Sequence, residues 1–344
     1  MSEHVTTAQA DHPTLPTPTS LPGIVRQLTS GGRGILAADE SIATMSQRLE
    51  DAGVVASAAA RRDYRQLLLT APGLSRHVSG IILCDETFGQ ALSDGRPFPR
   101  AARELGILPG IKVDTGTEPW GTQGALVTRG LDGLGARLAD YGARGAAFAK
   151  WRAVFDVRSI SEEGARVNAA ALAEYARACQ DHGIVPVVEP EVLAAGDHDM
   201  VACARASATA LDAVFEALDG AGVDLAGIVL KPSFVTPGLA GRQLSARTVA
   251  TVTLDTLRRH VPTEVAGIAF LSGGHTTADA CDFLAALNLH EDVPWDLTFS
   301  FGRALVSDAL ETWAGSPAHV TRAQHALLAH CVSAARATAR SEAA

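Results

Sequence analysis

Short apolar runs recur along the chain at intervals of roughly 30–45 residues, and each run ends abruptly in charged or polar residues or in glycine. Nearly every position within a run is apolar, which is typical of parallel strands that are buried on both faces. The spacing indicates repeated βα units. The eight runs occupy residues 34–40, 80–86, 110–114, 146–152, 185–191, 227–233, 267–274 and 296–303.

Helical patterns lie between these runs. The clearest is the amphipathic segment 165–183, which is rich in alanine and leucine and which Gly183 is expected to close. Two more patterns cover 199–222 and 276–289, and the second is expected to begin at an N-cap, Thr276 or Thr277. Eight strands that alternate with helices predict an α/β fold, the (β/α)8 or TIM barrel.

The barrel is expected to form a single domain over residues 31–315, because no linker or change in composition interrupts this segment. Residues 1–30 begin with a stretch of Pro, Thr and Asp that has no continuous apolar run, and they are predicted to form a flexible N-terminal arm. Residues 316–344 are alanine-rich and are predicted to form a terminal helix with a short polar tail.

Polar residues at the predicted strand ends are the candidates for chemistry, because the strands of such a barrel all end at one mouth, where the active site lies. Asp39 ends the first run, and Glu189 and Glu191 end the fifth. The three lysines, Lys112, Lys150 and Lys231, belong to three further runs. The mouth is therefore expected to hold an unusual concentration of charge.

The scarcity of lysine strengthens this interpretation. Of the 29 basic residues, 26 are arginine. Arginine can supply a positive charge almost anywhere, but it cannot lose a proton near neutral pH and act as an amine nucleophile. The lysines are therefore candidates for a role that needs an amine.

Composition excludes several classes of partner. The chain has 344 residues, 47% of them hydrophobic, and a formal net charge of −9, which argues against nucleic acid or an anionic membrane as its main partner. No apolar run approaches the roughly 20 residues that a membrane span needs. The five cysteines are scattered without a C-x-x-C pair, as expected of reduced thiols in a cytoplasmic protein.

The candidate residues suit imine chemistry on a ketone. A second ammonium nearby makes a lysine amine easier to deprotonate, so Lys150 is expected to activate Lys231 as a nucleophile. Glu189 and Glu191 lie two residues apart on a strand and project to the same side. Two close carboxylates are expected to raise the pKa of one of them, which would then hold a proton for transfer. Asp39 is expected to accept the hydroxyl proton that starts carbon–carbon cleavage.

Two groups of residues are expected to bind phosphate. The turns that follow the seventh and eighth runs combine glycine, serine and arginine, as phosphate sites of barrels commonly do; they contain Ser272, Gly273, Gly274, Ser300, Gly302 and Arg303. Arg48, Lys112 and Arg152 form a second cationic group. Two separate groups around an imine-forming lysine indicate a substrate that is phosphorylated at both ends.

The chain resembles the class I fructose-bisphosphate aldolases of the animal and plant type over residues 31 to about 335. The motifs that carry the resemblance are GILAADES, GIKVD, FAKWR, GIVPVVEPE, LKPSFVTPG, FLSGGH and TFSFGRAL, in the order of the family. The resemblance implies reversible cleavage of fructose 1,6-bisphosphate to dihydroxyacetone phosphate and glyceraldehyde 3-phosphate, in glycolysis and gluconeogenesis. It implies no metal or other cofactor, and a cytoplasmic homotetramer.

The resemblance also assigns roles to residues. Lys231 would form the Schiff base beside Lys150, Glu189 would be the general acid and base, and Glu191 and Asp39 would assist proton movement. Ser272, Gly273, Ser300, Gly302 and Arg303 would hold the 1-phosphate. The 6-phosphate side would comprise Ser41, Arg48, Lys112 and Arg152, with Thr44 at the position of a family serine and Arg61 as a further anion contact.

The sequence disfavours some alternative functions and leaves others open. A zinc-dependent aldolase is disfavoured because the histidines show no tight ligand pair, and only His198 and His275 lie near the mouth. Other imine-forming barrel enzymes, transaldolase and deoxyribose-phosphate aldolase, are disfavoured by the two phosphate groups. A barrel that serves as a non-enzymatic scaffold, and an aldolase of broader specificity that accepts fructose 1-phosphate or sedoheptulose 1,7-bisphosphate, are the remaining alternatives.

Two departures from the family predict a substrate preference. Gln47 replaces a lysine of the first loop, and the sequence ends at ARSEAA, where many relatives carry a terminal tyrosine that reaches the active site. We therefore expect a weaker preference for fructose 1,6-bisphosphate over fructose 1-phosphate than relatives with that tyrosine show. Steady-state kinetics with both substrates would measure it, and a large preference for the bisphosphate would contradict the expectation.

Overall fold

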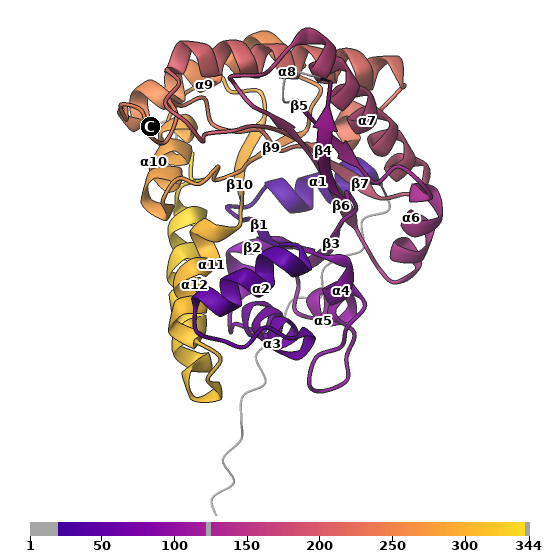
Figure 1. Ribbon diagram of the computed structural model, residues 1–344, viewed down its shortest axis with the longest axis vertical. Helices are drawn as coiled ribbons and strands as arrows, with labels where there is room; N and C mark the ends of the chain where they lie inside the picture. Colours follow the sequence, from indigo (N-terminus) through magenta and orange to yellow (C-terminus); the bar gives the residue numbers. More distant parts are fainter. Residues whose placement is uncertain (1–19, 122–124, 341–344) are drawn as a thin grey trace, which may run out of the picture.

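Eight parallel strands close into a barrel in the computed structural model, which describes residues 20–121 and 125–340 (Figure 1). Neighbouring strands follow the order β1-β10-β9-β8-β7-β6-β3-β2. The predicted (β/α)8 barrel is confirmed, and each apolar run overlaps one barrel strand. The strands are β1 (Gly34–Ala38), β2 (Val78–Leu83), β3 (Leu108–Lys112), β6 (Phe148–Phe155), β7 (Val185–Val192), β8 (Val229–Leu230), β9 (Gly267–Phe270) and β10 (Asp296–Phe301).

Helices surround the barrel, and several begin at a side chain that caps the helix. Thr276 accepts a hydrogen bond from the backbone N–H of Asp279, so it is the N-cap of its helix as predicted. The helices outside the strands are α2 (Ile42–Asp51), α3 (Ala58–Leu69), α4 (Asp85–Phe88), α5 (Phe98–Glu104), α6 (Leu134–Ala143), α7 (Glu162–Asp181), α8 (Met200–Gly220), α9 (Ala246–His260), α10 (Thr277–Asn288), α11 (Arg303–Trp313) and α12 (Val320–Arg336).

The segment before the barrel is not an arm throughout. Residues 1–19 lie outside the described residues, but Leu21–Thr29 forms the helix α1, so the prediction of a flexible arm is wrong for that part. Ser20 caps this helix. The side chains of Val25 and Leu28 in α1 are fully buried in a cluster with the inward-facing residues of the strands. The apolar face of α1 was overlooked because it follows directly on the Pro- and Thr-rich stretch.

Glycines at the beginning of the strands make room for α1. A Cβ atom at Gly80 in β2 would lie 2.7 Å from Leu28 Cδ2, and one at Gly267 in β9 would lie 2.5 Å from Thr29 Oγ1. These distances are below van der Waals contact, so only glycine lets the helix approach the strands this closely. Helix α1 therefore closes the end of the barrel opposite to the mouth.

A β-hairpin interrupts the βα repeat after β3. Its strands β4 (Gly116–Trp120) and β5 (Ala125–Arg129) pair antiparallel and pack against α7. Asn168 of α7 fixes the hairpin, because its side chain donates to the backbone O of Leu126 (2.7 Å) and accepts from the N–H of Thr128 (3.3 Å). This hairpin was not predicted, because its strands are short and mix exposed, half-buried and buried positions without a clear pattern.

The main core lies between the barrel and its helices. Helices α11 and α12 lie side by side, and α12 also packs on α3 and α10 (Figure 1). The short 3-10 helices η1 (Leu74–Arg76), η2 (Leu225–Gly227) and η3 (Pro317–His319) connect elements. Within the described ranges, no helix combines the length and the apolar character that a membrane span requires.

The position of α1 predicts the effect of a cavity at the bottom of the barrel. Replacing Leu28, which is 0% exposed, by alanine is expected to lower the free energy of unfolding by about 2–5 kcal/mol, because the rigid strand ends cannot fill the space. Urea denaturation would measure the change. Leu289→Ala is the matched control, since Leu289 is 64% exposed and should change the free energy of unfolding by less than about 0.5 kcal/mol. Similar values for both variants would contradict the role of α1.

Candidate active site

A pocket of about 380 Å³ opens at the C-terminal ends of the barrel strands. Most of the residues expected to act on substrate line it, although they come from distant parts of the chain. Parallel strands end at the same side of the barrel, and this brings them together. The pocket is lined by Ala37, Asp39, Glu40, Thr44, Arg48, Lys150, Arg152, Glu189, Glu191, Lys231, Leu271, Ser272, Gly273, Gly274, Ser300, Gly302 and Arg303.

Two lysines and two carboxylates form the centre of this pocket. The Glu189 carboxylate bridges the lysines, with Oε1 3.0 Å from the Nζ of Lys231 and Oε2 3.3 Å from the Nζ of Lys150. The Nζ of Lys150 also lies 2.6 Å from Asp39 Oδ2. All four residues are buried, so the charges interact in a medium that screens them weakly.

The register of the strands positions this centre. Strands β6 and β7 pair so that Arg152 lies beside Glu189, which leaves Lys150 one step below on the same face of β6. Lys231 directly follows β8, and its backbone N–H donates to the O of Val188 in β7 (2.8 Å). The backbone of Lys231 is thus tied to β7, the strand that carries Glu189.

Burial and pairing set the protonation states. Burial raises the pKa of Asp39, but the charges of Lys150 and Lys231 outweigh it and lower this pKa to about 2. Burial also raises the pKa of Glu189, and the same two lysines with Arg152 lower it below its usual value. Burial lowers the pKa of Lys150, and the surrounding carboxylates, Asp39 first, raise it above its usual value. Both carboxylates are therefore ionised in this structure.

One glutamate of the pair was expected to have a raised pKa and so to hold a proton, but Glu189 does not have a raised pKa. Glu189 and Glu191 do line the same pocket, as expected from their spacing. However, the Glu191 carboxylate binds the guanidinium of Arg152, while Glu189 contacts two ammonium groups. The glutamate pair was expected to raise the pKa of one of its two members, but the pKa of Glu189 is lowered, because the nearby cations outweigh the second carboxylate.

One side of the pocket offers donors that have no partner. Gly273 and Gly274 have φ angles of 58° and 93°, a left-handed turn that glycine favours, and this turn brings the backbone close to Arg303. Helix α11 begins at Arg303 without a side-chain cap, so its first N–H groups are free to bind an anion. The Ser300 hydroxyl is buried and without a hydrogen-bond partner, and the Arg303 guanidinium makes no ion pair within the described ranges.

The other side of the pocket holds paired cations. Arg48 binds the carboxylate of Glu40, as Arg152 binds that of Glu191. Thr44 lines the pocket beside Arg48. Ser41 caps helix α2 by accepting from the N–H of Thr44 (3.2 Å) and is exposed outside the pocket lining.

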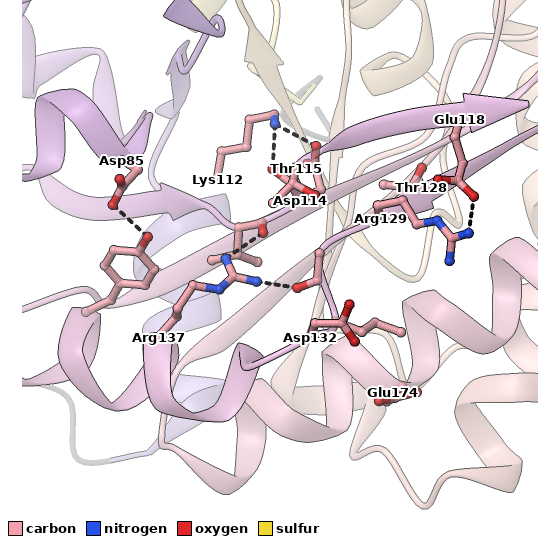
Figure 2. Close-up of a pocket in the computed structure, with 14 residues that line it drawn as sticks. Asp85, Lys112, Asp114, Thr115, Glu118, Thr128, Arg129, Asp132, Arg137 and Glu174 are labelled. Carbon is pink, nitrogen blue, oxygen red and sulfur yellow. Dashed lines mark hydrogen bonds and ion pairs between the residues drawn. The ribbon is translucent and has the colours of Figure 1, made fainter.

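Besides Ser41, two further residues expected at the 6-phosphate side, Arg61 and Lys112, are absent from the pocket lining. The Arg61 guanidinium binds Glu86 (2.6 Å) and the hydroxyl of Ser46 (2.9 Å), away from the pocket lining. Lys112 points into a second, larger hollow of about 920 Å³ between β3, the hairpin and α6, where its Nζ lies 2.6 Å from Asp114 Oδ1 (Figure 2). This structure thus does not place Lys112 or Arg61 in the catalytic pocket.

Comparison with known proteins agrees with this geometry. The family described as "Fructose-bisphosphate aldolase class-I" matches residues 20–343. The chain belongs to the class I fructose-bisphosphate aldolase family. The "Fructose-bisphosphate aldolase 5, cytosolic" of Arabidopsis thaliana is 45% identical over 310 residues, covering 89% of this chain and 87% of the relative. The "Fructose-bisphosphate aldolase" of Drosophila melanogaster is 44% identical over 310 residues, covering 89% and 86%.

Solved structures give the same result. The structure of fructose-bisphosphate aldolase from Plasmodium falciparum, in complex with TRAP and a small-molecule inhibitor, superposes with a TM-score of 0.90 at 38% identity and covers 92% of this chain and 93% of that one. The predicted family, the barrel and the class of enzyme, an aldolase, are confirmed. The family match is to class I, so the zinc-dependent and non-enzymatic alternatives are set aside.

Three residues near the active site of this aldolase were missed by the sequence analysis. Glu40 lines the pocket and Asp114 holds Lys112, although both stand at the end of runs that were recognised. Arg65 of α3 is 1% exposed and binds Glu40 from behind the pocket. For Glu40 and Asp114 the signal was present in the motifs ADE and KVD, but nothing in the helix of Arg65 distinguishes a buried arginine from an exposed one.

The low pKa of Asp39 predicts a dependence of stability on pH. Its folded-state pKa of about 2 lies below the ordinary 3.8, so ionised Asp39 stabilises the fold above about pH 4, and this contribution is lost as the pH falls towards 2. The loss should amount to roughly 2 kcal/mol. Urea denaturation of wild type and Asp39→Asn should therefore differ most above about pH 5 and converge near pH 2. A difference that is independent of pH would contradict the interpretation.

Proposed function

We propose that this aldolase reversibly cleaves fructose 1,6-bisphosphate to dihydroxyacetone phosphate and glyceraldehyde 3-phosphate through a Schiff base on Lys231. The observation that carries the proposal is the Glu189 carboxylate, which bridges the amines of Lys231 and Lys150 in a buried pocket. The bridge gives Lys231 an acceptor for its proton at 3.0 Å and places a second ammonium beside the reaction centre.

Proton transfer through Glu189 accounts for imine formation. Lys231 passes a proton to Glu189, and the free amine attacks the ketone carbon. A proton then moves from the attacking nitrogen to the former ketone oxygen, which gives the carbinolamine. Protonated Glu189 then gives the proton to the carbinolamine hydroxyl, which leaves as water and yields the iminium. The Lys150 ammonium, which stays charged beside two carboxylates, stabilises the oxygen while it carries negative charge.

Asp39 is placed to start the cleavage. Its ionised carboxylate lies in the pocket opposite Glu189 and accepts the proton of the substrate's C4 hydroxyl as the C3–C4 bond breaks. The electrons of that bond move to the iminium nitrogen and form an enamine, while the C4 fragment leaves as the aldehyde. Protonation at C3 and hydrolysis of the imine release the ketose fragment and restore Lys231.

The two ends of the pocket suit two phosphates. On one side Arg303, the free N–H groups of α11 and the unpartnered Ser300 hydroxyl would bind the 1-phosphate. On the other side Arg48, with Thr44 and Arg152, would bind the 6-phosphate. Relatives from Arabidopsis thaliana and Pisum sativum are named cytosolic or cytoplasmic aldolases, which supports a cytoplasmic location for this chain. A homotetramer is proposed from the family resemblance alone.

A broader range of ketose phosphates is the second candidate. Gln47 stands where the family often has lysine, and its amide donates to Asp51 (2.9 Å) instead of adding a positive charge to the 6-phosphate side. Fewer cations at this end reduce the gain in affinity from a second phosphate. Fructose 1-phosphate and sedoheptulose 1,7-bisphosphate are therefore proposed as further substrates.

Reductive trapping tests the Schiff base. Borohydride reduction in the presence of dihydroxyacetone phosphate should fix the triose on Lys231 and abolish activity, because reduction turns the imine into a stable amine. Peptide mass mapping can assign the adduct without ambiguity, since the chain has only three lysines. Lys231→Arg should abolish cleavage in a folded protein, because it keeps the charge and removes the amine that can lose its proton.

The other lysines serve as controls within the same sample. Lys150 stays paired with two carboxylates and Lys112 with Asp114, so neither should carry the triose. An active, folded enzyme that is trapped on either of these residues, or that is not trapped at all, would contradict the proposed role of Lys231.

A further inference from the structure

Arg65 is a buried cation behind the active site. Its side chain extends from α3 and is 1% exposed, and one guanidinium nitrogen lies 2.7 Å from Glu40 Oε2. The guanidinium also contacts the sulfur of Met45 (2.9 Å) and the backbone O of Glu40 (3.5 Å). A buried charge needs a counter-ion, and Glu40 is the only carboxylate with which Arg65 pairs in the described part of the chain.

The Glu40 carboxylate forms ion pairs with two arginines. Its Oε1 binds Arg48, which lines the pocket, while its Oε2 binds Arg65, which does not. The formal charges of the three side chains add up to one positive charge. Without Arg65, the carboxylate of Glu40 would cancel the charge of Arg48, and the pair that faces the pocket would be neutral.

The other charges around the pocket cancel. Lys150 and Lys231 face Asp39 and Glu189, and Arg152 faces Glu191. Each of these sets has as many carboxylates as cations. In the described part of the chain, net positive charge at the pocket therefore lies in two places: at Arg303, and in the group of Arg48, Glu40 and Arg65, of which Arg65 stands behind the pocket lining.

We propose that Arg65 is a positioning residue for bisphosphate recognition: it neutralises and holds Glu40, so that Arg48 keeps a net positive charge for the distal phosphate. The inference rests on the proposed function of the pocket. A phosphate that approaches Arg48 must otherwise compete with a full carboxylate charge. Arg65 also contacts both the carboxylate and the backbone of Glu40, so it fixes the residue that directly follows Asp39.

The test compares cleavage of fructose 1,6-bisphosphate with cleavage of fructose 1-phosphate, which lacks the distal phosphate. In Arg65→Met the ratio of the two kcat/KM values should fall about tenfold, the size of a partly screened charge interaction, mainly through a higher KM for the bisphosphate. Arg65→Lys, which keeps the charge, should recover most of the ratio. Arg144→Met is the control, since Arg144 is the C-cap residue of α6, pairs with Asp140 and lies outside the pocket lining, and the ratio should not change.

Charge rescue separates this role from a merely structural one. The double variant Arg65→Met with Glu40→Gln removes one positive and one negative charge and leaves Arg48 cationic. It should therefore restore the ratio towards the wild-type value, although both buried partners are gone. A double variant as impaired as Arg65→Met would overturn the inference, because lost packing would then explain the effect.

The remaining outcomes are equally decisive. An unchanged ratio in folded Arg65→Met, or an equal loss with both substrates, would overturn the inference while wild-type cleavage upholds the proposed function. If Arg65→Met does not fold, the single variant Glu40→Gln tests the inference instead, because it removes the carboxylate that neutralises Arg48. Its ratio should equal or exceed that of wild type, and a fall would contradict the role of Arg65. Absence of wild-type cleavage and of a Lys231 adduct would instead count against the proposed function.

Discussion

The Glu189 carboxylate between two buried ammonium groups is the contact on which the active site depends. Two buried lysines side by side would repel each other, and a catalytic amine needs a partner that can take its proton. Glu189 meets both needs from the centre of β7, and Asp39 adds the second negative charge that the two lysines require. The barrel holds these four side chains, which come from β6 and β7 and from the residues directly after β1 and β8, in one network of ion pairs.

The same principle of charge compensation extends outward. Arg152 is matched by Glu191, and Lys112 is matched by Asp114 in the neighbouring hollow. An anionic substrate can use only the cations that are not already neutralised, so counting arginines and lysines overestimates the attraction of the pocket. Arg303 and the arginine pair around Glu40 are the exceptions among the described residues. The pattern of pairing thus carries more information about recognition than the number of cations.

The sequence predicted what depends on local pattern. Runs such as 185–191 are apolar at nearly every position because both faces of a barrel strand are buried, so the strands and their polar ends were recognisable. Side-chain partners were less predictable. Lys112 and Arg61 were assigned to the 6-phosphate side, whereas in this structure they pair with Asp114 and Glu86 outside the pocket lining. The charge of Lys112 nevertheless lowers the pKa of Asp39. Such choices depend on tertiary distances, as does the burial of Arg65 and the use of Leu21–Thr29 as a closing helix.

The small number of lysines, and their positions in or near the pocket, matter for an enzyme whose substrates and products are carbonyl compounds. Aldehydes and ketones condense with exposed amines, and such adducts modify protein surfaces. Here two of the three lysines are buried in the pocket and the third is held by Asp114, while arginine supplies nearly all other positive charge. Because a guanidinium does not form imines in this way, the outer surface offers carbonyl compounds few side chains to attack. Unwanted glycation by its own triose products is thereby limited.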